Sequence, residues 1–159
     1  MGAGIGNIIQ CTPAIRKISE FLDQPVDVVI NQDFPGCEWL LAGSKYVNMV
    51  FSSDSLYVGR RYEYAFVLAS FGKVIPQFQA RNTYVARQHF PFQLTEHVHE
   101  AEYNLKCLAG AGIGLDYEPD DVKKYFVGNR RPTGLTSRRI ILHAGGKGDE
   151  WAVKRWPYF

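Results

Sequence analysis

Three residues near the N-terminus have the types and spacing of a ligand site. Gly4 and Gly6 stand just before Asn7, and an apolar stripe typical of a helix follows them. Glycines let a backbone turn tightly beside a bound group, and a helix start offers unpaired N–H donors and a positive dipole end. The pattern predicts a glycine-rich turn that leads into a helix and holds a hydroxyl-rich or anionic ligand. Asn7 would position a hydroxyl group of the ligand there or, alternatively, cap the helix.

Further side chains that could carry chemistry are scattered along the chain. Asp33 follows a short β-branched run, so it would lie at the carboxyl end of a strand, as a general base or as a residue that closes a turn. His97 and His99 are two positions apart and have no set of cysteines or carboxylates nearby, so we expect no metal site. Four arginines would bind phosphate groups of a ligand or form a solvated surface: Arg130, Arg131, Arg138 and Arg139.

Two stretches resemble the motifs of one enzyme family. Residues 4–16, Gly-x-Gly-Asn-x-x-x-x-Thr-Pro-Ala-Ile-Arg, are similar to the N-terminal signature of the ADP-heptose:lipopolysaccharide heptosyltransferases, which are two-domain enzymes of the GT-B architecture. Residues 139–146, Arg-Ile-Ile-Leu-His-Ala-Gly-Gly, resemble that family's strand and glycine-rich turn, and residues 154–157 resemble its Lys-Arg-Trp-Pro box. Two motifs in the right order are more specific than either alone.

The resemblance implies a glycosyltransferase that moves a heptose or related sugar from a nucleotide-diphosphate donor to a lipopolysaccharide-type glycan. The reaction would be an inverting displacement without a metal or cofactor. The resemblance places the acceptor at Gly4, Gly6 and Asn7. It places the donor at Gly145, Gly146 and Lys154, with His143 beside the donor turn.

Asn7 departs from the family pattern, because the family's usual base at this position is an aspartate. An amide is not a usable base near neutral pH, although it can position the acceptor hydroxyl. Asn7 would then position the acceptor while a carboxylate such as Asp33 takes the proton; alternatively, the protein differs from the family in acceptor or activity.

The composition fits a single domain of moderate charge. A chain of 159 residues with 46% hydrophobic residues can bury one core. The formal net charge of +2 gives little reason to expect nucleic acid as a partner. Three cysteines without metal or redox spacing favour a reduced, cytoplasmic setting. No apolar run reaches the roughly 18 to 20 residues that cross a bilayer, so we expect at most peripheral contact, at the inner face of the cytoplasmic membrane.

Alternating helical and strand patterns predict an α/β fold, Rossmann-like, with a mainly parallel sheet and helices on both faces. Apolar spacing predicts a helix over about 8–22, and Pro13 either kinks it or begins it with Thr12 as the cap. A second helix over about 96–109 would be capped by Thr95 and stopped by residues 110–112. Residues 77–92 are expected to form a loop with possible short strands. The remaining expected elements are strands at 26–30, 46–51, 64–69, 140–142 and, more weakly, 73–75, a short helix at 37–42, a loop at 31–36, and a surface connection at 115–138 with a helical turn at 119–126.

The two ends differ from a complete enzyme of this kind. A Rossmann-like domain opens with a strand that leads into the glycine turn, and residues 1–3 leave no room for one. The chain stops two residues after Pro157, so the donor-binding C-terminal domain is expected to be absent. We therefore expect a single acceptor-side domain over 1–159, with 147–159 as the start of the interdomain region, that is inactive by itself.

Two other functions remain open. Gly2 and Gly4 before a helix suggest the dinucleotide fingerprint of an NAD-dependent oxidoreductase. However, its third glycine would fall at Asn7, and Asn31 occupies the place of the ribose-binding acid. A non-catalytic carbohydrate-binding module is the other alternative, because Asn7 replaces the base and half of the enzyme is missing.

Overall fold

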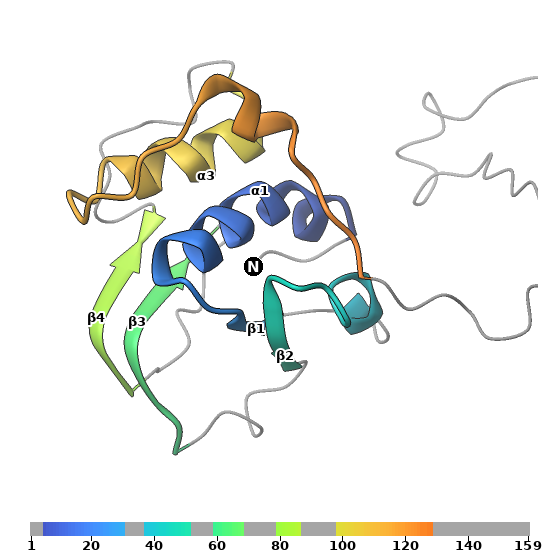
Figure 1. Ribbon diagram of the computed structural model, residues 1–159, viewed down its shortest axis with the longest axis vertical. Helices are drawn as coiled ribbons and strands as arrows, with labels where there is room; N and C mark the ends of the chain where they lie inside the picture. Colours follow the sequence, from blue (N-terminus) through green and yellow to red (C-terminus); the bar gives the residue numbers. More distant parts are fainter. Residues whose placement is uncertain (1–4, 31–36, 52–58, 69–78, 87–97, 129–159) are drawn as a thin grey trace, which may run out of the picture.

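The computed structural model describes residues 5–30, 37–51, 59–68, 79–86 and 98–128. Mixed α and β elements form this part of the chain (Figure 1). In chain order they are α1 (Ile5–Leu22), β1 (Val26–Val29), the 3₁₀ helix η1 (Cys37–Leu40), β2 (Val47–Phe51), β3 (Arg61–Val67), β4 (Gln79–Val85), α3 (Glu100–Ala109) and the 3₁₀ helix η3 (Pro119–Lys123).

Helix α1 is continuous through Pro13 and begins three residues earlier than the apolar spacing predicted. A proline cannot donate an N–H to the carbonyl four residues before it, which here is that of Ile9. The hydroxyl of Thr12 donates to that carbonyl at 2.7 Å instead. Of the two predicted alternatives, a helix start at Pro13 with Thr12 as its cap is therefore wrong.

The four strands form two separate parallel pairs, β1 with β2 and β3 with β4. The first pair aligns Val26 with Val47 and Val29 with Phe51, with an irregularity between Val26 and Val28. Parallel pairing confirms the coarse prediction of an α/β fold with parallel strands. Within the described residues each sheet has two strands, so the larger continuous sheet is not seen there.

The predicted elements match the structure with some changes. Strands predicted at 26–30 and 46–51 are β1 and β2, and the strand predicted at 64–69 is shifted to β3 at Arg61–Val67. The segment 77–92, predicted as a loop with possible short strands, contains β4, which pairs with β3 along seven residues. The short helices predicted near 37–42 and 119–126 are η1 and η3. The expected elements at 31–36, 73–75 and 140–142 lie outside the described residues.

Helix α3 ends as predicted and starts later. Its last residue is Ala109, followed by Gly110 as the C-cap, and Gly112 has a left-handed φ of 69° that glycine accommodates best. It begins at Glu100 rather than near 96, because the imidazole Nδ1 of His99 accepts the N–H of Ala101 and caps the helix. The predicted cap, Thr95, lies outside the described residues.

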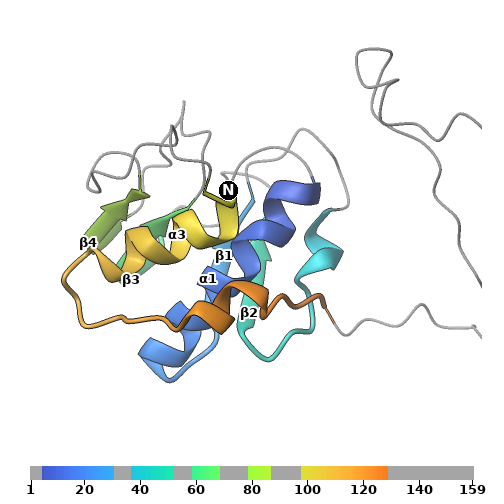
Figure 2. The same cartoon turned by 90° about the horizontal axis from the view of Figure 1, so that it is seen from above.

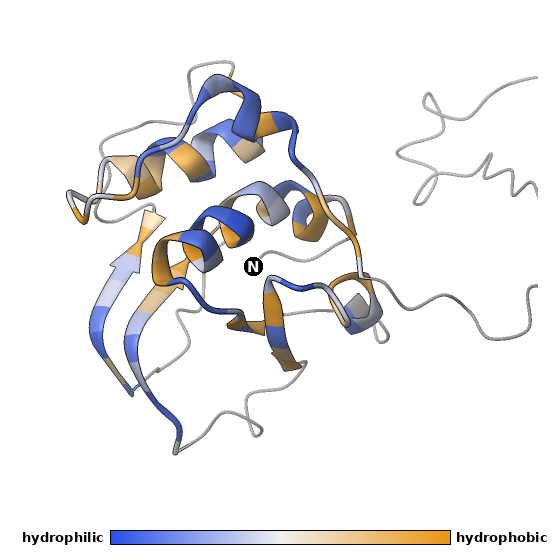
Figure 3. Cartoon of the chain, viewed as in Figure 1, coloured by the Kyte–Doolittle hydropathy of each residue, from blue (hydrophilic) through white to orange (hydrophobic). Residues whose placement is uncertain are grey.

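The core lies between the two α-helices and the strands. Figure 2 shows α1 and α3 side by side, and their contact includes the fully buried Ile8, Cys11, Leu105 and Leu108. Val28, Ile30, Leu41 and Val47 extend the same core into the first strand pair. In Figure 3, β1 and β2 are mainly apolar, whereas the segment around η3 is hydrophilic. The apolar face of α1 therefore belongs to one core with α3 and the first strand pair.

Candidate functional site

The first turn of α1 carries two of the predicted acceptor residues. Gly6 is exposed and Asn7 is half-buried. The turn contains no acidic side chain, so no carboxylate from within it competes for its N–H donors. Gly4, the third predicted acceptor residue, lies outside the described residues. The structure thus brings Gly6 and Asn7 together at the beginning of one helix.

The glycine-rich turn is shorter than predicted, because Ile5 and Gly6 already belong to α1. Gly6 does not have the left-handed backbone that would require glycine, and an added Cβ would meet no atom within 4 Å. Asn7 lies inside the helix, so its interpretation as the helix cap was wrong. A glycine at position 6 is therefore not explained by the fold.

The rest of the N-terminal motif is packing. Thr12, Pro13, Ala14 and Ile15 are buried. The hydroxyl of Thr12 also accepts the N–H of Phe126 at 3.3 Å, which fastens the segment after η3 to the middle of α1. The motif therefore divides into an N-terminal turn that reaches the surface and a C-terminal part that builds the core.

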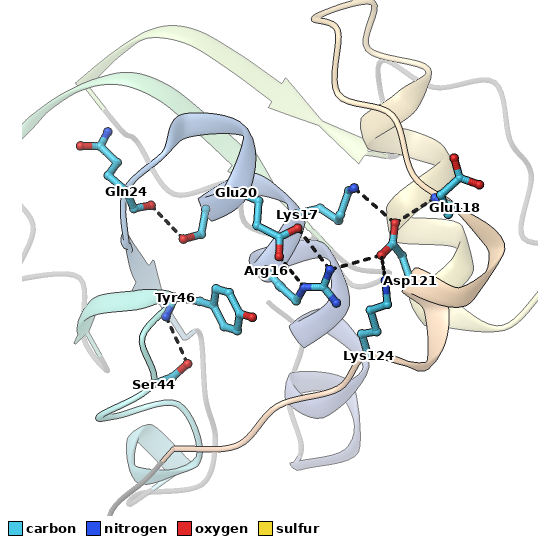
Figure 4. A network of polar contacts seen from close by, with 10 residues as sticks. Arg16, Lys17, Glu20, Gln24, Ser44, Tyr46, Glu118, Asp121 and Lys124 are labelled. Atoms are coloured by element: carbon cyan, nitrogen blue, oxygen red, sulfur yellow. Dashed lines mark hydrogen bonds and ion pairs between the residues drawn. The ribbon is translucent and has the colours of Figure 1, made fainter.

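Asp121 is the centre of a charged cluster between α1 and η3 (Figure 4). Its side chain is 4% exposed and lies 3.3 Å from Arg16 Nη2, 3.2 Å from Lys17 Nζ and 2.8 Å from Lys124 Nζ. The backbone N–H of Glu118 donates to its Oδ2 at 2.8 Å. Asp121 thus has partners from two distant parts of the chain, which identifies it as an anchor between them.

The pKa of Asp121 reflects two opposing effects. Desolvation by burial raises it, but the hydrogen bonds from Lys124, the Glu118 N–H and Lys17 together outweigh burial and hold the pKa well below its usual range. Arg16 also binds Glu20 through two hydrogen bonds, of 2.7 and 3.2 Å. Asp121 therefore stays ionised and serves as the shared partner of these cations within the fold.

A cavity of about 340 Å³ lies between β1 and β3, and we call it the interstrand slot. Its walls are one face of α1, the link to β1, and the two strands themselves. The lining residues from the helix are Ile15, Ile18 and Leu22, and those from the strands include Val26–Val29 and Tyr62–Val67. Most of these side chains are apolar, so the slot suits an apolar occupant better than a sugar or nucleotide.

A polar cluster around Asp27 lines the slot near the beginning of β1 and β3. The carboxylate of Asp27 accepts hydrogen bonds from Asn48 Nδ2 at 2.8 Å, Tyr62 Oη at 3.0 Å and Arg60 Nη1 at 3.3 Å. Desolvation, and then the hydrogen bond to Asp27, raise the pKa of Tyr62. The phenol stays protonated as a donor, so this cluster joins the two strand pairs at one end.

Cys11 and Cys107 are buried free thiols. Burial raises the pKa of Cys11 to about 12 and that of Cys107 to about 11. Such thiols are poor nucleophiles near neutral pH. Among the described residues, no group of three His, Cys, Asp or Glu side chains could hold a metal ion.

The predicted donor residues and Asp33 lie outside the described residues, as do the basic cluster and two histidines. They are Asp33, His97, Arg130, Arg131, Arg138, Arg139, His143, Gly145, Gly146, Lys154 and Trp156. The structure therefore neither brings them to Asn7 nor separates them from it.

Sequence reasoning did not single out Asp27 or Asp121. The spacing of Glu118 and Asp121 is that of a capping box, which could have drawn attention to Asp121. Apart from that spacing, no local feature distinguishes Asp121 from the exposed Asp120, since the burial of Asp121 comes from packing against α1. Asp27 could have been singled out from the sequence, because it lies within a β-branched run and a charged residue in a buried strand needs partners.

No family model, curated protein or solved structure matches the chain. Among the described helices, none has the length and apolar character that would let it cross a membrane.

Proposed function

We propose that this chain is the acceptor-side domain of a glycosyltransferase that transfers a heptose or related sugar from a nucleotide-diphosphate donor to a lipopolysaccharide-type glycan. The observation that carries the proposal is the division of the N-terminal motif. Its Thr-Pro-Ala-Ile part is buried in α1, whereas Gly6 and Asn7 reach the surface at the start of the same helix. A rigid helix whose first turn carries no charged side chain is well suited to receive a hydroxyl-rich ligand.

The proposed chemistry assigns each residue one task. The Asn7 amide holds an acceptor hydroxyl by hydrogen bonds, which orients its oxygen toward the anomeric carbon of the donor sugar. As the bond between these atoms forms, a carboxylate, for which we propose Asp33, takes the hydroxyl proton. The bond to the nucleoside diphosphate breaks, and Lys154 and the N–H groups near Gly145 and Gly146 stabilise the charge on that leaving group.

Acceptor binding can be tested on the 159-residue protein itself. Titration with a heptose-containing core oligosaccharide should shift the backbone amide signals of Gly6 and Asn7 in NMR spectra. Asn7→Ala should weaken binding by about tenfold, corresponding to about 1.4 kcal/mol for a lost hydrogen-bonding group. Gln10→Ala is the matched control, because Gln10 is also half-buried and lies one turn later in the same helix. Unchanged affinity of the Asn7→Ala protein would remove Asn7 from the site.

The competing functions give different outcomes in the same experiment. Shifts on addition of NAD, without shifts on addition of the oligosaccharide, would favour an oxidoreductase. Turnover of ADP-heptose by the 159-residue chain alone would contradict the acceptor-side assignment, in which this chain supplies only part of the donor site and a second domain supplies the rest.

Asn7→Asp separates a catalytic role from simple carbohydrate binding. In a polypeptide that also carries the donor domain, a large gain in transfer rate would indicate that position 7 is the site of the base. An unchanged rate would assign the base to another carboxylate. Absence of transfer in both proteins, with glycan binding retained, would favour a non-catalytic module.

A further inference from the structure

Met49 is a methionine that the fold leaves open to solvent. It lies in β2 and is 42% exposed, whereas Val47 and Phe51 of the same strand are buried. Oxidation of sulfur side chains follows their exposure. Cys11 and Cys107 are buried, and buried thiols react slowly. Among the side chains that the structure describes, Met49 therefore has the sulfur atom that an oxidant reaches most easily.

The guanidinium of Arg60 is in contact with this sulfur atom. Arg60 Nη2 donates to Met49 Sδ at 3.5 Å, while Nη1 of the same group donates to Asp27 Oδ2 at 3.3 Å. The guanidinium also lies over the ring of Phe51, with its carbon atom 4.9 Å from the ring centroid. Met49 and Phe51 are two positions apart, so their side chains point to the same face of β2. Arg60, the residue before β3, thus connects this face of β2 to β1.

Oxidation changes the strength of this contact. A thioether sulfur is only a weak hydrogen-bond acceptor. Hydrogen peroxide converts it to a sulfoxide: the sulfur gives up two electrons and bonds to one peroxide oxygen, the O–O bond breaks, and the second oxygen leaves as water with both protons. The sulfoxide oxygen accepts a charge-assisted bond from the guanidinium, which is stronger than a bond from a neutral donor. Because Nη1 binds Asp27 and Nη2 binds Met49, both contacts of Arg60 can be kept.

We propose that Met49 and Arg60 form a redox-sensitive switch. Hydrogen peroxide oxidises Met49 to its sulfoxide, which strengthens the contact with Arg60 and stabilises the packing of β1, β2 and the start of β3. Methionine sulfoxide usually destabilises a protein, because it places a polar group in an apolar core. Here the sulfur is exposed and faces a cation, so the effect has the opposite sign. Methionine sulfoxide reductases, which return the sulfoxide to the thioether, reset the switch.

Controlled oxidation of the 159-residue protein tests the proposal, which is independent of what binds at Asn7. Dilute hydrogen peroxide is followed by a thiol, which reverses disulfides and leaves sulfoxides in place, and peptide mass spectrometry verifies the added oxygen at Met49. Urea unfolding then compares the stability of the oxidised and untreated proteins. Oxidation should lower the equilibrium constant of unfolding by about threefold, because a weak contact becomes a charge-assisted one. Treatment with methionine sulfoxide reductases should restore the original value.

Two arginine variants decide whether Arg60 carries the effect. Arg60→Ala removes the guanidinium, so oxidation should no longer stabilise the protein. Arg61→Ala is the matched control at the next position, which is exposed, and there oxidation should give the same gain as in the unchanged protein. The stability of Met49→Leu should not respond to peroxide, and this variant accounts for oxidation at Met1 and at the thiols.

Equal responses of the unchanged and Arg60→Ala proteins to oxidation would overturn the proposal, as would a loss of stability when the unchanged protein is oxidised. NMR of the Arg60 side chain gives a second readout that needs no variant. Oxidation of Met49 should shift the guanidinium signals of Arg60 and slow their exchange with water. Unshifted signals in a protein that is fully oxidised at Met49 would show that Arg60 does not bind the sulfoxide, which would also overturn the switch.

Discussion

Arg16 and Asp121, which are 105 positions apart, are joined by a hydrogen bond of 3.3 Å from Arg16 Nη2 to Asp121 Oδ1. Arg16 belongs to the Thr-Pro-Ala-Ile-Arg part of the N-terminal motif, and Asp121 belongs to η3. The bond therefore gives the last residue of the motif a structural task. It also explains why a single turn of 3₁₀ helix stays in place against α1 (Figure 4).

Asp121→Asn should lower the free energy of unfolding by about 2 kcal/mol, because the cations of Arg16, Lys17 and Lys124 lose the buried charge that they share. Chemical unfolding at neutral pH measures the change. Asp120→Asn is the control, since the side chain of Asp120 is 81% exposed and its ion pair with Lys123 spans 3.5 Å. That substitution should change stability by less than about 0.5 kcal/mol. Equal effects of the two substitutions would contradict the role of Asp121 as an anchor.

Acid should destabilise the protein partly through Asp121. Its pKa is lowered in the folded state, whereas an unfolded aspartate titrates near about 3.9. The contribution is therefore complete above pH of about 4 and is lost as the pH falls toward the folded pKa, because the unfolded chain binds the proton first. Urea midpoints measured from pH 7 to pH 2 should fall less steeply for Asp121→Asn than for the unchanged protein. Parallel curves would contradict the assignment.

Thr12→Val should destabilise the protein by about 1–3 kcal/mol, because two backbone groups lose their partner in a fully buried place. The carbonyl of Ile9 loses the hydroxyl that replaces the missing N–H of Pro13, and the N–H of Phe126 loses its acceptor. Thr12→Ser keeps the hydroxyl and is the matched control. Amide exchange of Phe126 should accelerate in the valine protein and stay slow in the serine protein. Slow exchange in both would place the acceptor of Phe126 elsewhere.

Local patterns predicted those elements whose apolar residues face the core. The spacing of Ile8, Cys11, Ile15 and Ile18 predicted α1, and all four side chains are buried. The end of α3 at Gly110 follows from glycine chemistry that is visible in the sequence. These predictions succeeded because a single face of each element decides its conformation.

Other elements depend on partners that are distant in the chain. Strand β4 has mainly polar residues, and its side chains are half-exposed or exposed until Val85, so it carries no apolar alternation. Pairing with β3 gives it its conformation. The continuity of α1 through Pro13 likewise depends on the Thr12 hydroxyl, and the burial of Asp121 depends on α1. The prediction of a glycine turn failed at Gly6 because helix α1 extends further toward the N-terminus than its apolar stripe.

Gly6→Ala separates the stability of α1 from its function. Gly6 lies inside a helix with open space at the Cβ position, so alanine should stabilise the protein by about 0.5–1 kcal/mol. If the first turn of α1 receives the glycan, the same methyl group should reduce oligosaccharide affinity while it raises the melting temperature. The Gly6→Ala protein should therefore show a higher melting temperature in thermal unfolding and a lower oligosaccharide affinity in titration.

Gly128→Ala is the matched glycine control for that experiment. Its N–H donates to Leu40 O at 2.6 Å, and an added Cβ would collide with the Ala42 carbonyl oxygen. Since backbone atoms cannot move aside as a flexible side chain can, we expect a loss of about 1–3 kcal/mol. Stabilisation by alanine at both positions would show that the backbone at residue 128 can move away from η1 and Ala42 at little cost in free energy. Destabilisation at both would show that Gly6 has a packing role, and its exposed position in α1 would then no longer support a ligand site there.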